Sequence, residues 1–224
     1  MILKAEQISK RYFRKTGEAN HFFAVRNVSL ELTPGSVTVL MGRSGSGKTT
    51  LLHMLSGLLT PTEGKVWLDE TDLYQLSDDD LSRLRNEKIG VIPQGKSALD
   101  ALTVWENIML PLDLRGSKKE TDAVDGWLER LGIVHLRDAM PAELSGGELR
   151  RMAIARALAG TPDILLADEP TGDLDDENTQ LILKLLREEA NRGAAVLIVT
   201  HESGALTYAD NSFRMNGGNL ESIE

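Results

Sequence analysis

The sequence predicts an α/β fold with a mostly parallel sheet at its centre. Segments with the pattern of strands alternate with segments with the pattern of helices along most of the chain, as in folds built from strand–helix–strand units. Three short runs, 37–41, 164–167 and 195–200, are almost wholly apolar, which is typical of parallel strands buried on both faces. The 224 residues suffice for one large domain.

The first half of the chain carries most of the expected strands. A polar loop at 14–20 separates the first two, and the third leads into a glycine-rich loop and a helix that ends at Leu55, just before Gly57. Ser77, followed by three aspartates, predicts the start of a second helix, which runs to about Lys88. The strands of this half are expected at 2–9, 22–32, 37–41, 65–69 and 89–92.

A block of helices is expected at about 96–158, inserted between strands. The spacing of a capping box, a Ser or Thr followed three residues later by Glu, occurs at 103–106, 117–120 and 145–148. We therefore divide a single domain of 1–224 into a core, 1–95 and 159–224, and a helical subdomain, 96–158.

The last part of the chain returns to alternating strands and helices. A helix that ends near Gly193 separates the strands at 164–167 and 195–200, and Asn-Gly-Gly at 216–218 predicts a hairpin turn. One face of that helix is expected to consist of Leu181, Ile182, Leu185 and Leu186.

The composition argues against several classes of function. The formal net charge of −9 is opposite to what a nucleic-acid-binding surface needs, so no nucleic acid partner is expected. The chain has no cysteine, which excludes disulfides and thiolate metal sites. The longest apolar runs fall far short of the roughly 18 residues that a membrane helix needs. Contact with a membrane would therefore require a partner.

A phosphate-binding loop is the strongest local signal. Residues 42–49 read Gly-Arg-Ser-Gly-Ser-Gly-Lys-Thr and lie between an expected strand and an expected helix. In such loops the glycines let backbone N–H groups turn toward phosphates, and the helix N-terminus adds a positive dipole end. Lys48 is expected to reach the β- and γ-phosphates and the Thr49 hydroxyl to bind Mg²⁺. A chance turn rich in Gly and Ser would leave the flanking strand and helix unexplained.

Two carboxylates, Asp168 and Glu169, directly follow the apolar run at 164–167. They are expected at the C-terminal edge of a buried strand, where α/β sheets bind ligands. Beside a phosphate loop, Asp168 would hold Mg²⁺ through water, and Glu169 would orient or deprotonate the attacking water. Kinases, GTPases, helicases and transporter ATPases all have phosphate loops, so these two signals leave the class open.

The segment Leu144-Ser145-Gly146-Gly147-Glu148 decides the class. Ser145 and Glu148 have the spacing of a helix cap, but paired glycines are unfavourable in a helix and leave bare N–H groups that suit a phosphate. The segment resembles the signature motif of ABC ATPases and, as in that family, lies about 20 residues before the acidic pair. The usual last residue of the motif is Gln, and related ATPases also carry Glu.

The resemblance to ABC ATPases covers nearly the whole chain. It implies a P-loop NTPase (RecA-like) core, an antiparallel β subdomain and an inserted helical subdomain. Gln94 looks like the Q-loop glutamine, which contacts Mg²⁺ and water, and His201 looks like the switch histidine at the γ-phosphate. Asp173 and Asp175 lie in the segment that resembles the D-loop, where Asp173 replaces a frequent Asn.

Tyr12 resembles the aromatic residue that stacks on adenine, although Phe13, Phe22 and Phe23 are rivals for this role. The expected catalytic residues are Glu169, His201 and Gln94, and the expected Mg²⁺ ligands are Thr49, Gln94 and Asp168. The expected ATP-binding residues are Tyr12, Gly42, Arg43, Ser44, Gly45, Ser46, Gly47, Lys48, Thr49 and Thr50.

Within ABC ATPases the sequence resembles the subfamily of lipoprotein-releasing, macrolide-exporting, bacitracin-resistance and cell-division proteins. Residues 106–112, 141–147 and 168–172 carry this resemblance. The chain departs from the subfamily around Gln94, because Pro93 stands where an aromatic residue is usual and Gly-Lys-Ser follows. That segment normally meets the membrane subunit, so the departure bears on the partner rather than on the ATPase.

The resemblance also implies partners. Two copies would form a homodimer, head to tail, with each ATP between the phosphate loop of one copy and the signature motif of the other, which acts in trans. An integral membrane permease would hold the chain at the cytoplasmic face of the cell membrane, docked near Gln94 and residues 96–115. Leu99, Leu102 and Trp105 are candidate contacts, with core packing an equal alternative for Trp105.

Other functions remain open from the sequence. An ABC ATPase that regulates a membrane partner by shape change, without transport, fits the cell-division branch, and the neighbouring gene would discriminate the two. An ABC ATPase of DNA repair or translation usually has two cassettes, a long coiled coil or zinc-binding cysteines, none of which this sequence shows. A small-molecule kinase would leave 144–148 and His201 unexplained.

Overall fold

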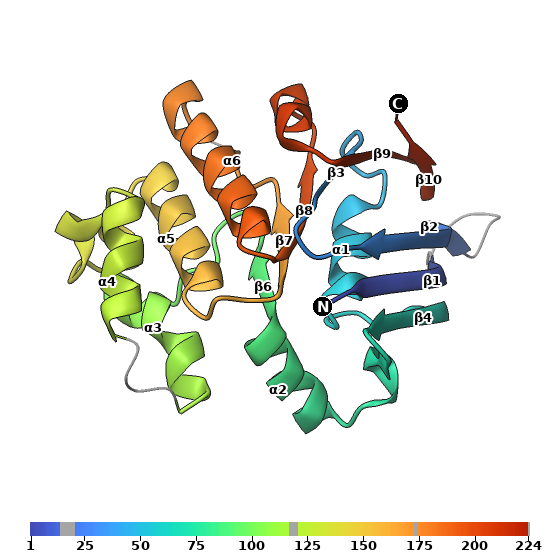
Figure 1. Cartoon of the computed structure of the whole chain (residues 1–224), viewed down its shortest axis with the longest axis horizontal. Helices are drawn as coiled ribbons and strands as arrows, with labels where there is room; N and C mark the ends of the chain where they lie inside the picture. The colour runs from blue at the N-terminus through green and yellow to red at the C-terminus, as the bar shows by residue number, and fades with distance from the viewer. Residues whose placement is uncertain (14–20, 117–120, 173, 224) are drawn as a thin grey trace.

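The computed structural model describes residues 1–13, 21–116, 121–172 and 174–223, with the Thr121 side chain left out. Two sheets and a group of helices build the molecule (Figure 1). The first sheet has the order β2-β1-β4-β5, and its paired strands are antiparallel. Its strands are β1 (Leu3–Phe13), β2 (His21–Leu32), β4 (Glu63–Leu68) and β5 (Thr71–Asp72). The expected antiparallel β subdomain is thus confirmed.

The second sheet has the order β10-β9-β3-β8-β7-β6. The pairs from β9 to β6 are all parallel, and only the terminal β10 runs antiparallel to its neighbour. The mostly parallel sheet predicted from the apolar runs is therefore confirmed. Its strands are β3 (Val37–Met41), β6 (Ile89–Ile92), β7 (Ile164–Asp168), β8 (Ala195–Thr200), β9 (Asn211–Asn216) and β10 (Asn219–Ser222).

The parallel sheet separates two hydrophobic cores, because successive side chains of a strand point to opposite faces. On β7, Leu166 packs in the core that contains the β1–β2–β4 side chains and helix α1 (Lys48–Leu55). Leu165 packs on the other face, with α5 (Gly146–Leu158) and α6 (Asp176–Asn191). Helix α1, which begins at the phosphate loop, is thus enclosed between the two sheets and held firmly.

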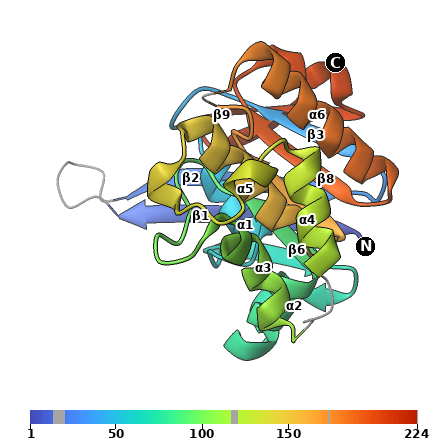
Figure 2. The same ribbon diagram turned by 90° about the vertical axis from the view of Figure 1, so that its left-hand side faces the viewer.

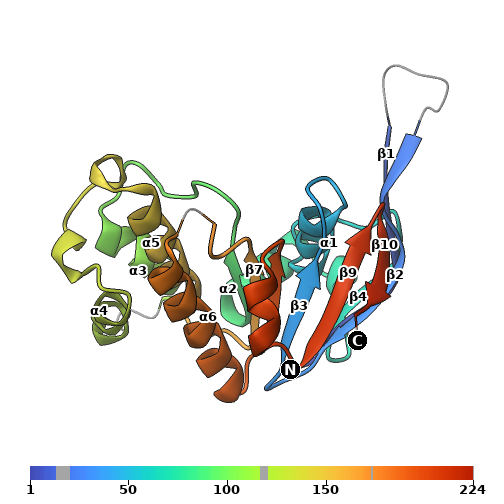
Figure 3. The same cartoon turned by 90° about the horizontal axis from the view of Figure 1, so that it is seen from above.

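Three helices, α3 (Val104–Leu114), α4 (Thr121–Arg130) and α5, follow β6 and precede β7 in the chain. Figure 2, seen from their side, shows them in front of the sheets, and Figure 3 shows them at the end of the molecule opposite the antiparallel sheet. Helix α2 (Asp78–Lys88) leads into β6. Short 3-10 helices lie at Leu73–Gln75, Val134–Leu136, Pro141–Glu143 and Ser203–Tyr208.

Most predictions of where helices begin or end are confirmed. Ser77 caps α2, Gly57 follows the end of α1 with a φ of 73°, and the capping boxes at Thr103 and Ser145 are both formed. The expected box at 117–120 and the loop at 14–20 lie outside the described residues.

Two expectations about elements were wrong. The first strand was expected to end at Ser9, but β1 continues to Phe13 because it stays paired with β2 as far as His21. Leu181 was expected on the apolar face of α6 but is 39% exposed. The buried residues of that helix are 182, 183, 185, 186, 189 and 190, which leaves Leu181 at the edge of its buried face.

Candidate functional site

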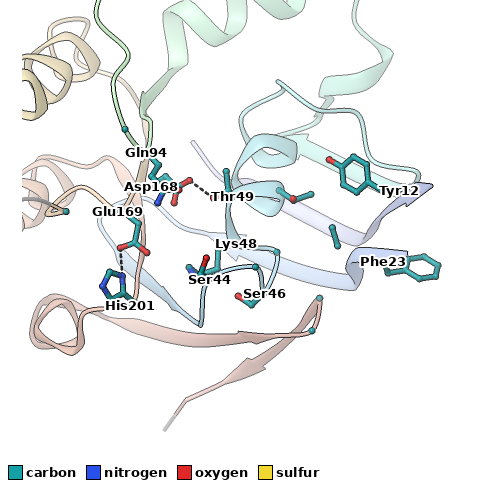
Figure 4. Close-up of a pocket in the computed structure, with 18 of the residues that line it drawn as sticks. Tyr12, Phe23, Ser44, Ser46, Lys48, Thr49, Gln94, Asp168, Glu169 and His201 are labelled. Carbon is teal, nitrogen blue, oxygen red and sulfur yellow. Dashed lines mark hydrogen bonds and ion pairs between the residues drawn. The ribbon is translucent and has the colours of Figure 1, made fainter. Parts of the chain in front are cut away.

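A cleft of about 1040 Å³ opens between the antiparallel sheet, the start of α1 and the ends of the parallel strands (Figure 4). It collects residues from segments that are far apart in the sequence. The residues that line it are Tyr12, Phe22, Phe23, Ala24, residues 44–50, Gln94, Gly95, Arg150, Asp168, Glu169, Gly172, His201, Glu202, Gly217 and Gly218.

The phosphate loop forms the floor of this cleft, between β3 and α1. Gly47 has a φ of 110°, and a Cβ there would lie 2.0 Å from the carbonyl oxygen of Ala24, so only glycine fits. Gly47 precedes α1 without a side-chain cap, which leaves the first N–H groups of the helix available to an anion. The local geometry is that of an anion-binding site.

Lys48 places its ammonium group inside the loop. The residue as a whole is 7% exposed, and its Nζ donates hydrogen bonds to the carbonyl oxygens of Gly42 at 2.7 Å and Arg43 at 3.2 Å. Neither Gly42 nor Arg43 lines the cleft, and the Arg43 side chain is exposed. The loop therefore brings together residues 44–50 as expected, whereas Gly42 and Arg43 support Lys48 through their backbone.

Thr49 and Asp168 meet at the inner end of the cleft. The Thr49 hydroxyl donates to Asp168 Oδ2 at 2.7 Å, across 119 residues of sequence. Asp168 is 2% exposed, and burial, above all, raises the pKa of its carboxyl group, while the Thr49 hydrogen bond opposes that shift. Its other oxygen, Oδ1, is buried and has no hydrogen-bond partner among the described residues. A hydroxyl and an unsatisfied carboxylate oxygen side by side suit a hard cation such as Mg²⁺.

Glu169 is held in an unusual backbone conformation just after β7. Its φ is 49°, a left-handed value that costs free energy in a residue with a side chain, while its N–H donates to the carbonyl of Val199 at 2.8 Å. Glu169 Oε2 accepts a hydrogen bond from the Thr200 hydroxyl at 3.2 Å and lies 3.0 Å from Nδ1 of His201. The strained turn directs a nearly buried carboxylate into the cleft, beside the phosphate loop (Figure 4).

Gln94 and the aromatic residues lie at opposite ends of the cleft (Figure 4). Gln94 follows β6 and its side chain is exposed. Tyr12 stacks on Phe22, with ring centroids 5.7 Å apart and an angle of 29° between the rings. Phe23 also lines the cleft, while Phe13 is 76% exposed and does not. The structure thus eliminates Phe13 as a lining residue and leaves three aromatic side chains at the site.

The signature segment lies outside this cleft. Ser145 caps α5, and Glu148 accepts hydrogen bonds from the Ser145 N–H at 2.8 Å and hydroxyl at 2.7 Å, so the capping function is formed. Ser145 and Gly146 are exposed, and Leu144 is partly buried against the core on the α5–α6 face of the parallel sheet. Asp175 caps α6, whereas Asp173 lies outside the described residues.

Sequence reasoning missed several residues of the site, and two of them, Arg150 and Thr200, make contacts that bear on its chemistry. Arg150 lines the cleft although it lies on α5, and Thr200 binds Glu169 from the strand end before His201. A polar residue at the end of an apolar strand is a signal that could have identified Thr200. No local pattern identifies Arg150, because it reaches the cleft only through the packing of α5 against the segment after β6.

Comparisons with known proteins agree on one family. Residues 25–172, more than half of the chain, match the ABC transporter family model. The chain is 39% identical to the lipoprotein-releasing system ATP-binding protein LolD of Shewanella frigidimarina, over 99% of this chain and 93% of that protein. It is 36% identical to the ABC transporter ATP-binding protein YtrE of Bacillus subtilis, over 92% of this chain and 91% of that one.

Solved structures give the same result. The dimeric structure of MJ0796, a bacterial ABC transporter cassette, superposes with a TM-score of 0.90 at 33% identity and covers 99% of both chains. A dimeric post-hydrolysis state of MJ0796 bound to ADP and Pi has a TM-score of 0.88 at 32% identity. The P-loop core predicted from the sequence is thereby confirmed. The chain belongs to the ABC transporter family, in which it is an ATP-binding and ATP-hydrolysing subunit.

Proposed function

We propose that two copies of this chain close head to tail around two ATP molecules. In this arrangement residues 42–50 of one copy and 144–148 of the other enclose each triphosphate. The exposure of Ser145 and Gly146, at a helix N-terminus outside the chain's own cleft, supports a role toward a second copy. The dimeric structures of the similar cassette MJ0796 support the same assembly. The division into a core, 1–95 and 159–224, and a helical subdomain, 96–158, belongs to this proposal.

In the cleft, Lys48 would turn from the carbonyls of its loop to the β- and γ-phosphates, and Tyr12 would stack on adenine. Thr49 and Asp168, with Gln94, would hold Mg²⁺. Among the described residues nothing hydrogen-bonds to Asp168 Oδ1, which leaves this oxygen available to the cation or to a water bound to it. When bound, the cation would neutralise charge on the phosphates. The chain's other contribution is to place these groups before the substrate enters.

For hydrolysis, we assign Glu169 as the general base. A water oxygen attacks the γ-phosphorus, Glu169 takes a proton from that water, and the bond to the β-phosphate oxygen breaks to give ADP and inorganic phosphate. Nδ1 of His201 lies at the Glu169 carboxylate, and the His201 side chain is 69% exposed, which leaves it free to turn to the γ-phosphate. Asp175 and Asp173 would complete the contacts between the two copies.

The ATPase would drive a separate integral membrane permease, which holds it at the cytoplasmic face of the cell membrane. Within the described residues, no helix combines the length and apolar character needed to cross a membrane. Two relatives of similar sequence identity, 39% and 36%, are named as parts of a lipoprotein-releasing system and of an ABC transporter. The exposed segment that begins at Gln94 and includes Leu99, which is 45% exposed, is the expected docking site. Trp105 is partly buried against the core on the α5–α6 face of the parallel sheet, which favours a structural role for this residue.

The observation that carries this function is the convergence of Lys48, Thr49, Asp168, Glu169 and His201 in one cleft. Glu169→Gln tests it, because the amide keeps the shape of the side chain and cannot accept a proton. We expect ATP affinity within about threefold of the parent, loss of hydrolysis by about 100-fold or more, and a stable dimer with ATP and Mg²⁺.

Calorimetry, phosphate release and gel filtration measure these three results. Glu70→Gln, at an exposed turn remote from the cleft, is the matched control and should behave as the parent. Hydrolysis at the parental rate by the Glu169→Gln variant would refute the assignment of the base.

A further inference from the structure

The segment that carries Gln94 is fastened at both ends to one helix. It leaves β6 at Ile92, and in the described part of the chain no backbone–backbone hydrogen bond holds residues 93–98. Arg150 Nη1 donates to the carbonyl of Pro93 at 2.7 Å. Arg156 donates to the Ser97 carbonyl at 2.9 Å and to its hydroxyl at 2.7 Å. The anchors of this segment are therefore side chains of α5 rather than a sheet or turn.

Both arginines are largely buried. Arg150 is 7% exposed, and burial lowers the pKa of Arg156, which also lies mostly inside the protein. A buried guanidinium needs acceptors for its N–H groups, and the carbonyls of Pro93 and Ser97 each accept a hydrogen bond from one of these arginines. The two residues are six positions apart on α5, about 9 Å along a helix at 1.5 Å per residue. They fix Pro93 and Ser97, the residues on either side of Gln94, Gly95 and Lys96.

The same helix begins at the signature segment. Ser145 is the N-cap of α5, and Arg150 lies little more than one turn further on. Gln94 and Arg150 both line the nucleotide cleft, whereas Ser145 does not. Helix α5 therefore connects the exposed residues 145 and 146 with the glutamine in the chain's own cleft.

We propose that Arg150 is a positioning residue for Gln94, and that with Arg156 it makes the Gln94 segment and the signature helix move as one body. This rests on the proposed ATPase role of Gln94. Pro93 is the first residue of this segment after β6. A proline donates no backbone hydrogen bond, so its carbonyl bond to Arg150 is the contact that fixes the start of the segment.

A double-mutant cycle tests whether Arg150 acts through Gln94. Arg150→Met removes the donors and keeps most of the side-chain volume. We expect a loss in kcat of about tenfold, similar to that of Gln94→Ala, with KM for ATP within about threefold. In the Gln94→Ala background the same substitution should cause no further loss. Arg150→Lys, which can still donate to the Pro93 carbonyl, should recover at least half of the lost rate.

Arg151→Met is the matched control, because Arg151 is the next residue of α5 but donates to Asn178 on α6 at 2.8 Å. Its effect should multiply with that of Gln94→Ala. If Arg150→Met does not fold, the cycle is run with Arg150→Gln. Equal losses from the Arg150 substitution in both backgrounds, or a parental kcat for it, would overturn the proposal. A parental rate for Gln94→Ala would instead remove Gln94 from the proposed mechanism, and the inference with it.

Discussion

Two glycine-containing segments of this chain, the loop at 42–47 and the pair Gly146–Gly147, differ in what requires their glycines. In the loop, the fold itself requires glycine. Gly47 has a φ of 110° and touches the Ala24 carbonyl, and a Cβ on Gly42 would lie 2.6 Å from the carbonyl oxygen of Met215. These backbone positions have no room for a side chain.

At the start of α5 the fold makes no such demand on Gly146. Both glycines have helical conformations, and an added Cβ on Gly146 would meet nothing within 4 Å, whereas one on Gly147 would lie 3.3 Å from Cδ2 of Leu174. Glycine in a helix lowers stability relative to alanine. The comparison indicates that the loop glycines serve this chain's own cleft, whereas Gly146 serves a molecule outside the chain. Four predictions test this distinction and the site around it.

The largest effect is expected for Gly47→Ala. The new Cβ overlaps the Ala24 carbonyl and is strained at a positive φ, so we expect a loss of about 1–3 kcal/mol or more in the free energy of unfolding. ATP binding should be lost with the distorted loop. Denaturant unfolding and calorimetry measure both. Parental stability would show that the loop can open to admit a side chain, and would remove the first half of the comparison.

The next largest effect is expected for Lys48→Ala, which keeps the loop glycines and removes the cation. Loss of charge-assisted hydrogen bonds to the phosphates should weaken ATP binding by about 100-fold or more. Calorimetry on the purified variant is the measurement, with unfolding curves to show that the fold is retained. Arg43→Ala is the comparison variant, and its effect should be far smaller because that side chain does not line the cleft. Equal ATP affinity for Lys48→Ala and the parent would refute the site.

Gly146→Ala should leave the monomer intact. The substitution removes a helix-destabilising residue in open space, so the free energy of unfolding should stay equal or rise by up to about 1 kcal/mol. ATP affinity of the single chain should not change. The methyl group should, however, obstruct a phosphate that approaches from the other copy.

The readout is the dimer that forms with ATP and Mg²⁺ in the Glu169→Gln background, which we expect to weaken by about tenfold. Gly126→Ala makes the same change inside α4, also with nothing within 4 Å of the new Cβ, and should leave the dimer unaffected. A normal dimer for Gly146→Ala would show that its glycine serves no second copy.

The smallest effect on the isolated chain is expected for Leu99→Asp. Leu99 is exposed, so folding and ATP affinity should stay within about threefold of the parent. Recovery of the chain with membranes that contain its permease should fall. Leu102 is less suitable, because its side chain is half-buried and its carbonyl binds Asn107 at 3.0 Å. Leu58→Asp, at another leucine that is 55% exposed, is the control. Equal membrane recovery for Leu99→Asp and the parent would place the docking surface elsewhere.

Features that depend on short stretches of chain could be predicted from the sequence. The order of residues in 42–49 defines the phosphate loop, because its glycines set the backbone and Lys48 follows at a fixed spacing. Helix starts at Ser77, Thr103 and Ser145 were predictable, since a cap bonds to an N–H only three residues away. The buried parallel strands were predictable from their almost wholly apolar runs.

Contacts between distant residues, in contrast, could not be predicted from local patterns. The Thr49–Asp168 bond spans 119 residues, and the Arg150–Pro93 and Arg156–Ser97 bonds span 57 and 59. The stacking of Tyr12 on Phe22 depends on how far β1 and β2 stay paired, and the exposure of Leu181 depends on which side of α6 the sheet covers. Local patterns fix backbone conformation, but such contacts depend on how whole elements pack, which no single stretch of sequence encodes.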